Sequence, residues 1–301
     1  MKKVFFLFCL FLGFAVLEAE SLKPYFLAGV EKGDYASIIT KTISALKKHD
    51  FEIVGKYSPM QDKNRTVICV THELIKNSVN EIGGLTAFAS VLRFGIYKNG
   101  DEIEISYLNP MYWGNAYYRT DFPKVEKNYS ALGKKIEALL KGQKGYKNLP
   151  YGSKLGKSIE KLRKYKYMIG MPKFGNVVII AEKTTYDEIV KRIRKNLSNK
   201  MGGSIKVYEI SYPAKKLTLF GIGLWGVRGE KKFLPKIDYK EPKHVTFLPY
   251  ELLVMKDKVV MLHGRFRIAL SFPDLTMGTF MKIVSTPRDI ANSMRLLTIV
   301  K

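Results

Sequence analysis

A repeated order of sequence features constrains the fold of this chain more than any other property. A short apolar run leads through a Glu-Lys pair to Tyr35, and a second such run leads in the same way to Tyr186. An amphipathic helix follows each tyrosine, with apolar residues at a 3.6-residue period. Asp34 and either Thr184 or Thr185 stand where the N-caps of these helices are expected. The pattern predicts two related units in one chain.

The two halves stay in the same order further along. Each helix is followed by an alternating run closed by a proline, which is typical of a strand, and then by a hairpin. We expect the hairpins to end at Pro110 and Pro273, and Pro123 and Pro287 to open helices. The offset between matched residues grows steadily, from 151 at the two tyrosines to 164 at the two helix-opening prolines.

The sequence therefore predicts an α+β fold. We expect two tandem, related α/β-sandwich domains, each with a mostly antiparallel sheet and helices on one face. The boundaries are a first domain at residues 22–140, a linker at 141–166 and a second domain at 167–301. The linker is basic, with nine Lys or Arg against one Glu.

The first half resembles the bacterial family called domain of unknown function 302. The residues that carry this resemblance are its helix, the strand Phe51 to Ser58, the hairpin and the closing Asn109-Pro110. The resemblance extends over about residues 25–140 and, more loosely, 175–300. It implies a small α+β domain present in two copies, and it implies no activity and no site residues.

The first twenty residues have the pattern of a secretory signal peptide. Lys2 and Lys3 precede an apolar run from Val4 to Leu17, and cleavage is expected after Ala19 or Ser21. Fourteen residues span roughly 21 Å as a helix, which is shorter than the hydrocarbon core of a bilayer. We therefore expect a periplasmic or secreted protein. The alternative is a chain held in the membrane by an uncleaved N-terminal anchor.

The net charge points to an anionic partner. The chain has 51 Lys and Arg against 27 Asp and Glu, a formal charge of +24, and residues 1–20 contribute two Lys and two Glu to it. The chain from residue 21 onward, which we expect to be exported, therefore keeps the formal charge of +24. Expected partners are an anionic small ligand, a lipid or an envelope polymer, with a protein partner also open. Nucleic acid ranks below these, because exported proteins rarely meet it.

No motif in the sequence predicts a cofactor or a metal. His72 begins a stretch close to the zinc-protease pattern, but Lys76 stands where the second histidine ligand is needed. The Gly-x-Gly-x-x-Gly string at Gly221 to Gly226 is followed by a charged stretch rather than by an apolar helix. We expect neither a metal nor a cofactor.

Two segments are candidate ligand-binding sites. The first follows the hairpin that carries Arg93, and its aromatic and polar side chains could line a pocket or pack on the core; its residues are Asn109, Tyr112, Trp113, Asn115, Tyr117 and Arg119. The second is predicted as a return strand whose alternation places His263, Arg265 and Arg267 on one face, suited to a carboxylate or phosphate or simply solvated. A joint site between the two halves is open.

Three functional classes follow. The leading hypothesis is a non-catalytic binding or interaction protein for an anionic ligand or envelope surface. The second is a periplasmic enzyme of unknown reaction, with a site near Arg93, Trp113 and His263. The third is a structural subunit of an envelope complex that docks through the basic linker.

Overall fold

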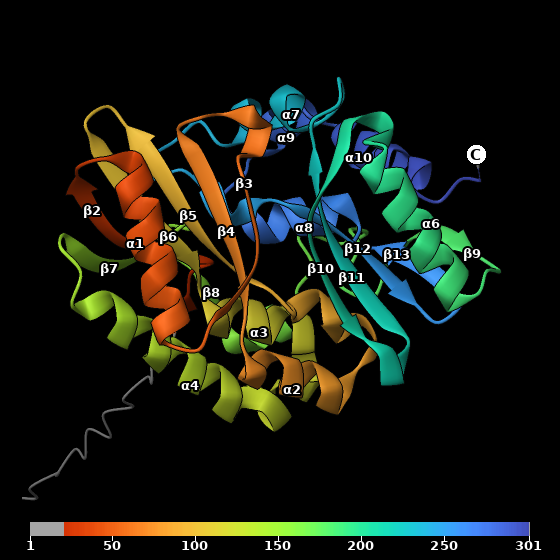
Figure 1. Ribbon diagram of the computed structural model, residues 1–301, viewed down its shortest axis with the longest axis horizontal. Helices are drawn as coiled ribbons and strands as arrows, with labels where there is room; N and C mark the ends of the chain where they lie inside the picture. The colour runs from red at the N-terminus through yellow and green to blue at the C-terminus, as the bar shows by residue number, and fades with distance from the viewer. Residues whose placement is uncertain (1–20, 301) are drawn as a thin grey trace, which may run out of the picture.

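The computed structural model describes residues 21–300 (Figure 1). The predicted signal peptide, residues 1–20, lies outside the described residues. The first half of the chain contains β1 (Ser21–Leu22), β2 (Tyr25–Lys32), α1 (Tyr35–Lys48), β3 (Glu52–Tyr57), β4 (Arg65–Thr71), α2 (Glu73–Ile82), β5 (Leu92–Asn99), β6 (Glu102–Leu108), α3 (Pro110–Tyr118), α4 (Phe122–Lys141), β7 (Tyr146–Tyr151), β8 (Lys157–Ser158) and α5 (Ile159–Arg163). The second half contains β9 (Val178–Glu182), α6 (Tyr186–Ser198), β10 (Ser204–Tyr212), β11 (Leu217–Leu224), α7 (Glu230–Ile237), β12 (Tyr250–Met255), β13 (Lys258–Met261), α8 (Gly264–Ser271), α9 (Met277–Met281) and α10 (Thr286–Leu296).

Two antiparallel sheets lie side by side and have the same strand order. The first runs β3-β4-β5-β6-β2-β7, and the second runs β10-β11-β12-β13-β9. Each strand of the second sheet therefore matches the strand of the first sheet that has the same place in the chain, and β7 is an addition at one edge. The α+β class and the antiparallel sheets predicted from the sequence are confirmed.

The two sheets share irregularities as well as order. An extra residue bulges from β2 at Ala28 and from β9 at Ile180, and another bulges from β3 at Val54 and from β10 at Val207. Such bulges are specific to a position in a sheet and are not forced by strand order alone. Each half also contains an equivalent hydrogen bond between a tyrosine and a threonine hydroxyl. It joins Tyr35 to Thr66 on β4 in the first half and Tyr186 to Thr218 on β11 in the second.

The two sheets meet at equivalent edges. Strand β3 lies against β10, and the bulges of both strands fall at the point of contact. A Cβ atom added at Gly55 would lie 2.9 Å from the carbonyl carbon of Val207 and 3.3 Å from Cβ of Tyr208. Glycine at this position therefore allows the close approach of the two edges. Contact between like edges is the arrangement found in two-fold symmetric dimers.

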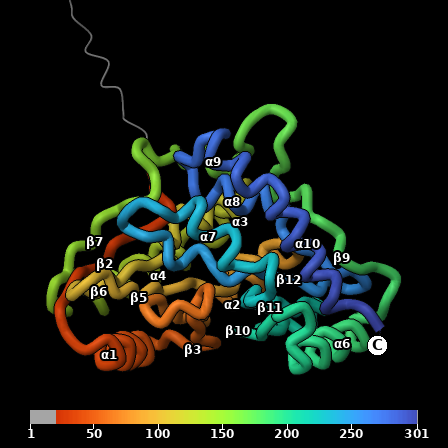
Figure 2. The backbone as a smooth tube through the Cα atoms, turned by 90° about the horizontal axis from the view of Figure 1, so that it is seen from above, coloured from red at the N-terminus to blue at the C-terminus, as the bar shows by residue number. Residues whose placement is uncertain are grey.

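Helices lie on both sides of the pair of sheets, whereas the sequence predicted them on one. Figure 2 shows α1 and α6 on one side and α7, α8 and α9 on the other. Consistent with cover on both faces, every residue of β4 and of β11 is buried. The buried apolar residues, from Leu22 to Leu297, form one hydrophobic core that includes both halves.

Tyrosines from the first half close the end of helix α8. The hydroxyls of Tyr25, Tyr112 and Tyr165 donate to the carbonyl oxygens of three successive residues, Ser271, Leu270 and Ala269, at 2.8–3.0 Å. The carbonyls of a last helical turn lack partners within the helix, so a buried helix end needs such donors. The end of α8 is thus part of the contact between halves.

Two expectations about segments differ from the structure. The predicted linker, residues 141–166, contains β7, β8 and α5, and β7 pairs with β2 of the first sheet. The second hairpin has a short return strand that ends at Met261, so the predicted end at Pro273 is wrong. By strand register, the residue equivalent to Asn109, which follows the first hairpin, is His263 and not a residue near Pro273. The openings of α4 and α10 at Pro123 and Pro287 are confirmed.

Candidate functional site

A cleft of about 310 Å³ opens between the segment after β7 and the loop that follows α7. Its walls come from both halves of the chain and combine apolar rings with polar groups. The lining residues used below are Lys23, Tyr151, Ser153, Lys154, Tyr239, Lys240, Glu241, His244, Phe272 and Asp274. A volume of this size fits a small ligand.

The lysines of the cleft have no carboxylate partner among the described residues. Glu241, at the cleft, pairs with Lys243 at 3.1 Å. Asp274 accepts hydrogen bonds from the Ser153 hydroxyl at 3.3 Å and from the backbone N–H of Lys154 at 2.7 Å. The lining thus has three lysines against two carboxylates, and Lys243 neutralises one of these, so the cleft has an excess of positive charge.

A buried carboxylate positions a histidine in the cleft wall. Asp238 accepts the backbone N–H of His244 at 2.8 Å, and the same oxygen lies 3.0 Å from its Nδ1. The other carboxylate oxygen pairs with Arg65 at 2.9 Å. Burial alone would raise the pKa of Asp238, but the hydrogen bonds from His244 and the charge of Arg65 outweigh it and lower the pKa. Asp238 is therefore ionised and holds Nδ1–H of the imidazole.

The other imidazole nitrogen is available to a ligand. The ring of His244 packs against Phe272 and Tyr25, with centroids 4.5 and 5.0 Å apart. No described residue hydrogen-bonds its Nε2, and this atom is not buried. The neutral ring presents an acceptor there, and the protonated ring presents a donor.

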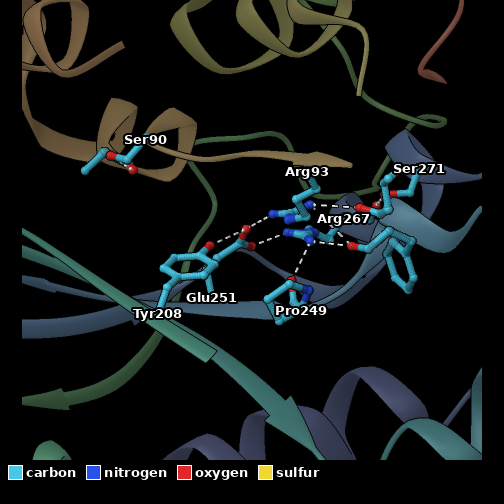
Figure 3. A network of polar contacts seen from close by, with 10 residues as sticks. Ser90, Arg93, Tyr208, Pro249, Glu251, Arg267 and Ser271 are labelled. Atoms are coloured by element: carbon cyan, nitrogen blue, oxygen red, sulfur yellow. Dashed lines mark hydrogen bonds and ion pairs between the residues drawn. The ribbon is translucent and has the colours of Figure 1, made fainter. Parts of the chain in front are cut away.

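A second polar cluster, completely buried, joins the two halves (Figure 3). The two oxygens of Glu251 pair with the guanidinium groups of Arg93 and Arg267, and the Tyr208 hydroxyl donates to the same carboxylate at 3.3 Å. The arginines also donate to backbone carbonyls of the segment 246–249. Burial alone would lower the pKa of Arg93, but the charge of Glu251 outweighs it and raises the pKa, so the guanidinium stays charged.

Strand register shows that Arg93 and Glu251 occupy equivalent positions. Thr66 pairs with Ile96 in the first sheet, and Thr218 pairs with Val254 in the second. Arg93 lies three residues before Ile96, and Glu251 lies three residues before Val254. Equivalent positions of the two halves thus carry opposite charges that meet each other, which a symmetric pair of identical units could not provide.

The chain shows little similarity to known proteins. No protein-family model matches it, and no curated protein matches it. Among solved structures it is similar to the crystal structure of an uncharacterized conserved protein DUF302 from Bacillus stearothermophilus. That similarity has a TM-score of 0.34 and 14% identity, and it covers 39% of this chain and 95% of the other.

None of the ten residues predicted as ligand-binding lines the cleft. Arg93 and Arg267 are brought together, as a joint site would require, but both are buried around Glu251. Trp113 donates its indole N–H to the carbonyl of Pro24 at 2.9 Å, and Tyr112 binds the end of α8. A void beside Arg93 and Trp113 measures about 10 Å³, which is room for at most one water.

The remaining predicted residues of the first segment have structural contacts. Asn109 is the N-cap of α3, where its side chain accepts backbone N–H groups. Asn115 accepts from Nε of Arg163 at 2.8 Å, and Nε of Arg119 donates to the Arg163 carbonyl at 3.0 Å. The ring of Tyr117 stacks on Phe174 at 5.2 Å.

The predicted strand face at residues 263–267 is wrong. These residues begin helix α8, and the ring of His263 is its N-cap, accepting the backbone N–H of Arg265. The helical turn separates the three side chains: Arg267 is buried, whereas Arg265 is exposed beside a small apolar hollow. They therefore do not form one row of cations. The strand prediction failed because the return strand ends after four residues.

The sequence reasoning missed the residues that form the cleft. Lys23 lies in the first described segment, and Asp238 and His244 follow helix α7. Their six-residue spacing matches no common motif. Among residues 21–300, no group of three or more His, Cys, Asp or Glu could hold a metal ion, and no helix is long and apolar enough to cross a bilayer.

Another buried carboxylate links the halves beside β3. Glu230, at the start of α7, accepts the backbone N–H groups of Met60 at 2.7 Å and Leu224 at 3.0 Å, and the Tyr57 hydroxyl at 3.4 Å. Burial raises the pKa of Glu230 to about 7, although these hydrogen bonds lower it.

This shift predicts a pH-dependent stability. The unfolded chain loses the Glu230 proton near pH 4.5, whereas the folded chain keeps it to about pH 7. The folded state is therefore favoured below this window and loses about 3 kcal/mol as pH rises through it. Urea unfolding at several pH values should show this loss in the wild type and not in Glu230→Gln. Equal pH dependence in the two proteins would contradict the prediction.

Proposed function

We propose that this chain is a non-catalytic binding protein that takes a small anionic molecule in the cleft beside His244. The observation that carries the proposal is the set of three lysines without carboxylate partners among the described residues, gathered around one cleft with an oriented imidazole. Ammonium groups bind phosphate and carboxylate oxygens, and a protonated imidazole adds a directed donor. The excess of positive charge in the sequence supports the same class of ligand.

The walls of the cleft narrow the class of ligand. Aromatic and apolar side chains, including Tyr151, Tyr239 and Phe272, line the same space as the lysines. A molecule with an anionic group and a flat or apolar body would fit both kinds of surface. A bare ion would leave the apolar part of the cleft unused.

We further propose that the halves are two copies of one unit like domain of unknown function 302, and that the protein acts outside the cytoplasm. Shared strand order, two shared bulges and the matching tyrosine–threonine hydrogen bond support a common origin. The basic start and apolar run of residues 1–20 support export.

One observation favours an enzyme as a second candidate. The pair Asp238–His244, with Nε2 free of described partners, is the arrangement of a general base held by a carboxylate. A panel of phosphate and carboxylate esters tests this candidate. Turnover that disappears in His244→Ala would support it, and no turnover of any ester would leave binding as the function.

The binding proposal predicts a specific loss. Isothermal titration with phenyl phosphate, which joins an anionic group to a flat apolar ring, should show binding that is at least tenfold weaker in the double variant Lys23→Gln, Lys240→Gln, because two ammonium contacts are removed. Lys47→Gln with Lys48→Gln, at the exposed end of α1, is the matched control and should bind within twofold of the wild type. Absence of binding by the wild type, or equal losses in both variants, would contradict the proposal.

A further inference from the structure

Three segments that are distant in the chain form one face of the molecule, which we call the Leu155 face. They are the loop 153–157, the loop 166–173 and the stretch 274–282 that contains α9. Asp274 accepts the backbone N–H of Lys154, and the Tyr167 hydroxyl donates to the Leu275 carbonyl at 3.2 Å, so the third segment contacts both others. In Figure 2 the two loops and α9 form the upper edge of the molecule.

Large apolar side chains project from each of these segments. Ile169 is 91% exposed and Leu155 87%, and on α9 Met281 is 57% and Met277 43% exposed. Single exposed apolar residues are ordinary on a protein surface, but several large ones on one face mark an interaction site. Nothing else in the described residues covers them.

Cations stand beside the apolar side chains. Exposed lysines at 154, 166, 173 and 282 lie within four residues of Leu155, Ile169 or Met281 and have no carboxylate within 4.0 Å among the described residues. The two acidic residues of the segments 153–173 and 274–282 are Glu160, which pairs with Lys164 at 2.9 Å, and Asp274, so the cations outnumber them. The face is therefore apolar and positively charged together.

The chain enters the described structure at this face. The Ser21 hydroxyl donates to the carbonyl of Leu155, and Ser21 pairs with Ser158 in the short sheet of β1 and β8. The apolar run Val4 to Leu17 precedes it in the sequence. If that run is retained as the alternative N-terminal anchor, its link to Ser21 would keep the Leu155 face close to the membrane.

We infer that the Leu155 face docks on an anionic lipid bilayer. Its apolar side chains enter the region between headgroups and acyl chains, and its lysines meet the anionic headgroups. A protein partner would account for the apolar side chains, but the surrounding cations and the place where the chain enters favour a membrane. The Leu155 face adjoins the cleft and shares Lys154 and Asp274 with it, but its exposed apolar side chains do not line the cleft, so the inference does not depend on the proposed ligand.

Vesicle sedimentation tests the inference. Because residues 22–297 supply the entire described core, the chain can be produced from Ser21 onward. It should sediment with vesicles of phosphatidylcholine and phosphatidylglycerol, and at least tenfold less with phosphatidylcholine alone. Ile169→Glu with Met281→Glu should weaken binding to the anionic vesicles at least tenfold.

The matched control is Leu149→Glu with Val300→Glu, which makes the same changes of charge at two exposed apolar residues outside the Leu155 face. It should bind within threefold of the wild type. Equal losses in the two double variants would overturn the inference, because net charge alone would then explain binding. No binding of the wild type to anionic vesicles would overturn it as well.

The outcome is separable from that of the cleft. His244→Asn should keep vesicle binding while weakening binding of phenyl phosphate in the cleft. Loss of vesicle binding in His244→Asn would place the lipid contact in the cleft and contradict a separate docking face.

Discussion

Glu251→Gln is expected to destabilise the protein by about 3–5 kcal/mol, as measured by urea unfolding. The carboxylate of Glu251 is the counter-charge of Arg93 and Arg267, and the side chains of all three residues are at most 3% exposed. A glutamine keeps the shape of the side chain but leaves two buried guanidinium groups without a negative partner. Neither arginine can lose its proton to relieve this, because the pKa of a guanidinium is too high.

The matched control for this change is Glu209→Gln. Glu209 also pairs with an arginine, Arg194, but the side chain of that arginine is 53% exposed. Exposed ion pairs contribute little, so the control should lose less than about 1 kcal/mol. Similar losses in the two variants would show that Glu251 is not required to neutralise the buried arginines.

Gly55→Ala is expected to destabilise the protein by about 3 kcal/mol. The added methyl group would overlap the backbone carbonyl of Val207, where β3 and β10 meet. Neither side can yield through a change of side-chain rotamer, since the contact is with backbone, so the two edges must separate. Thermal unfolding should show a clear loss of melting temperature.

The control is Gly133→Ala on helix α4. A Cβ atom at Gly133 would meet no atom within 4 Å, and alanine favours helix over glycine by about 1 kcal/mol. We therefore expect this variant to be as stable as the wild type or more stable. A melting temperature of Gly55→Ala equal to that of the wild type would contradict the close contact of the two edges.

Local signals were read correctly from the sequence, and long-range placement was not. Asp34 and Thr185 cap their helices as predicted, because a cap needs only its own helix. The first hairpin, which turns at Asn99-Gly100, and the helix openings at Pro123 and Pro287 also depend on neighbouring residues alone. The segment 263–267 was assigned wrongly, because alternation over so few residues does not separate a strand from a helical turn.

The candidate site shows the same division. Arg93 and Arg267 were selected as exposed ligand-binding cations, and their sequence neighbourhoods contain no acidic residue that would predict a buried pair. Their counter-charge, Glu251, comes from a strand 158 residues after Arg93. Asp238 and His244 were not selected, because their candidate role in binding depends on the cleft between β7 and the loop after α7.

The sequence by itself determined the α+β class, the helix, strand and hairpin near the start of each half, and the net charge. These follow from periodicity, caps and turns, which act over a few residues, and from composition. Only the tertiary structure decided how the two halves meet, because edge-to-edge contact at Gly55, burial of Arg93 and Arg267 and the grouping of lysines in one cleft join residues far apart in the chain. Burial and pairing are properties of three-dimensional neighbours, and no local pattern encodes them.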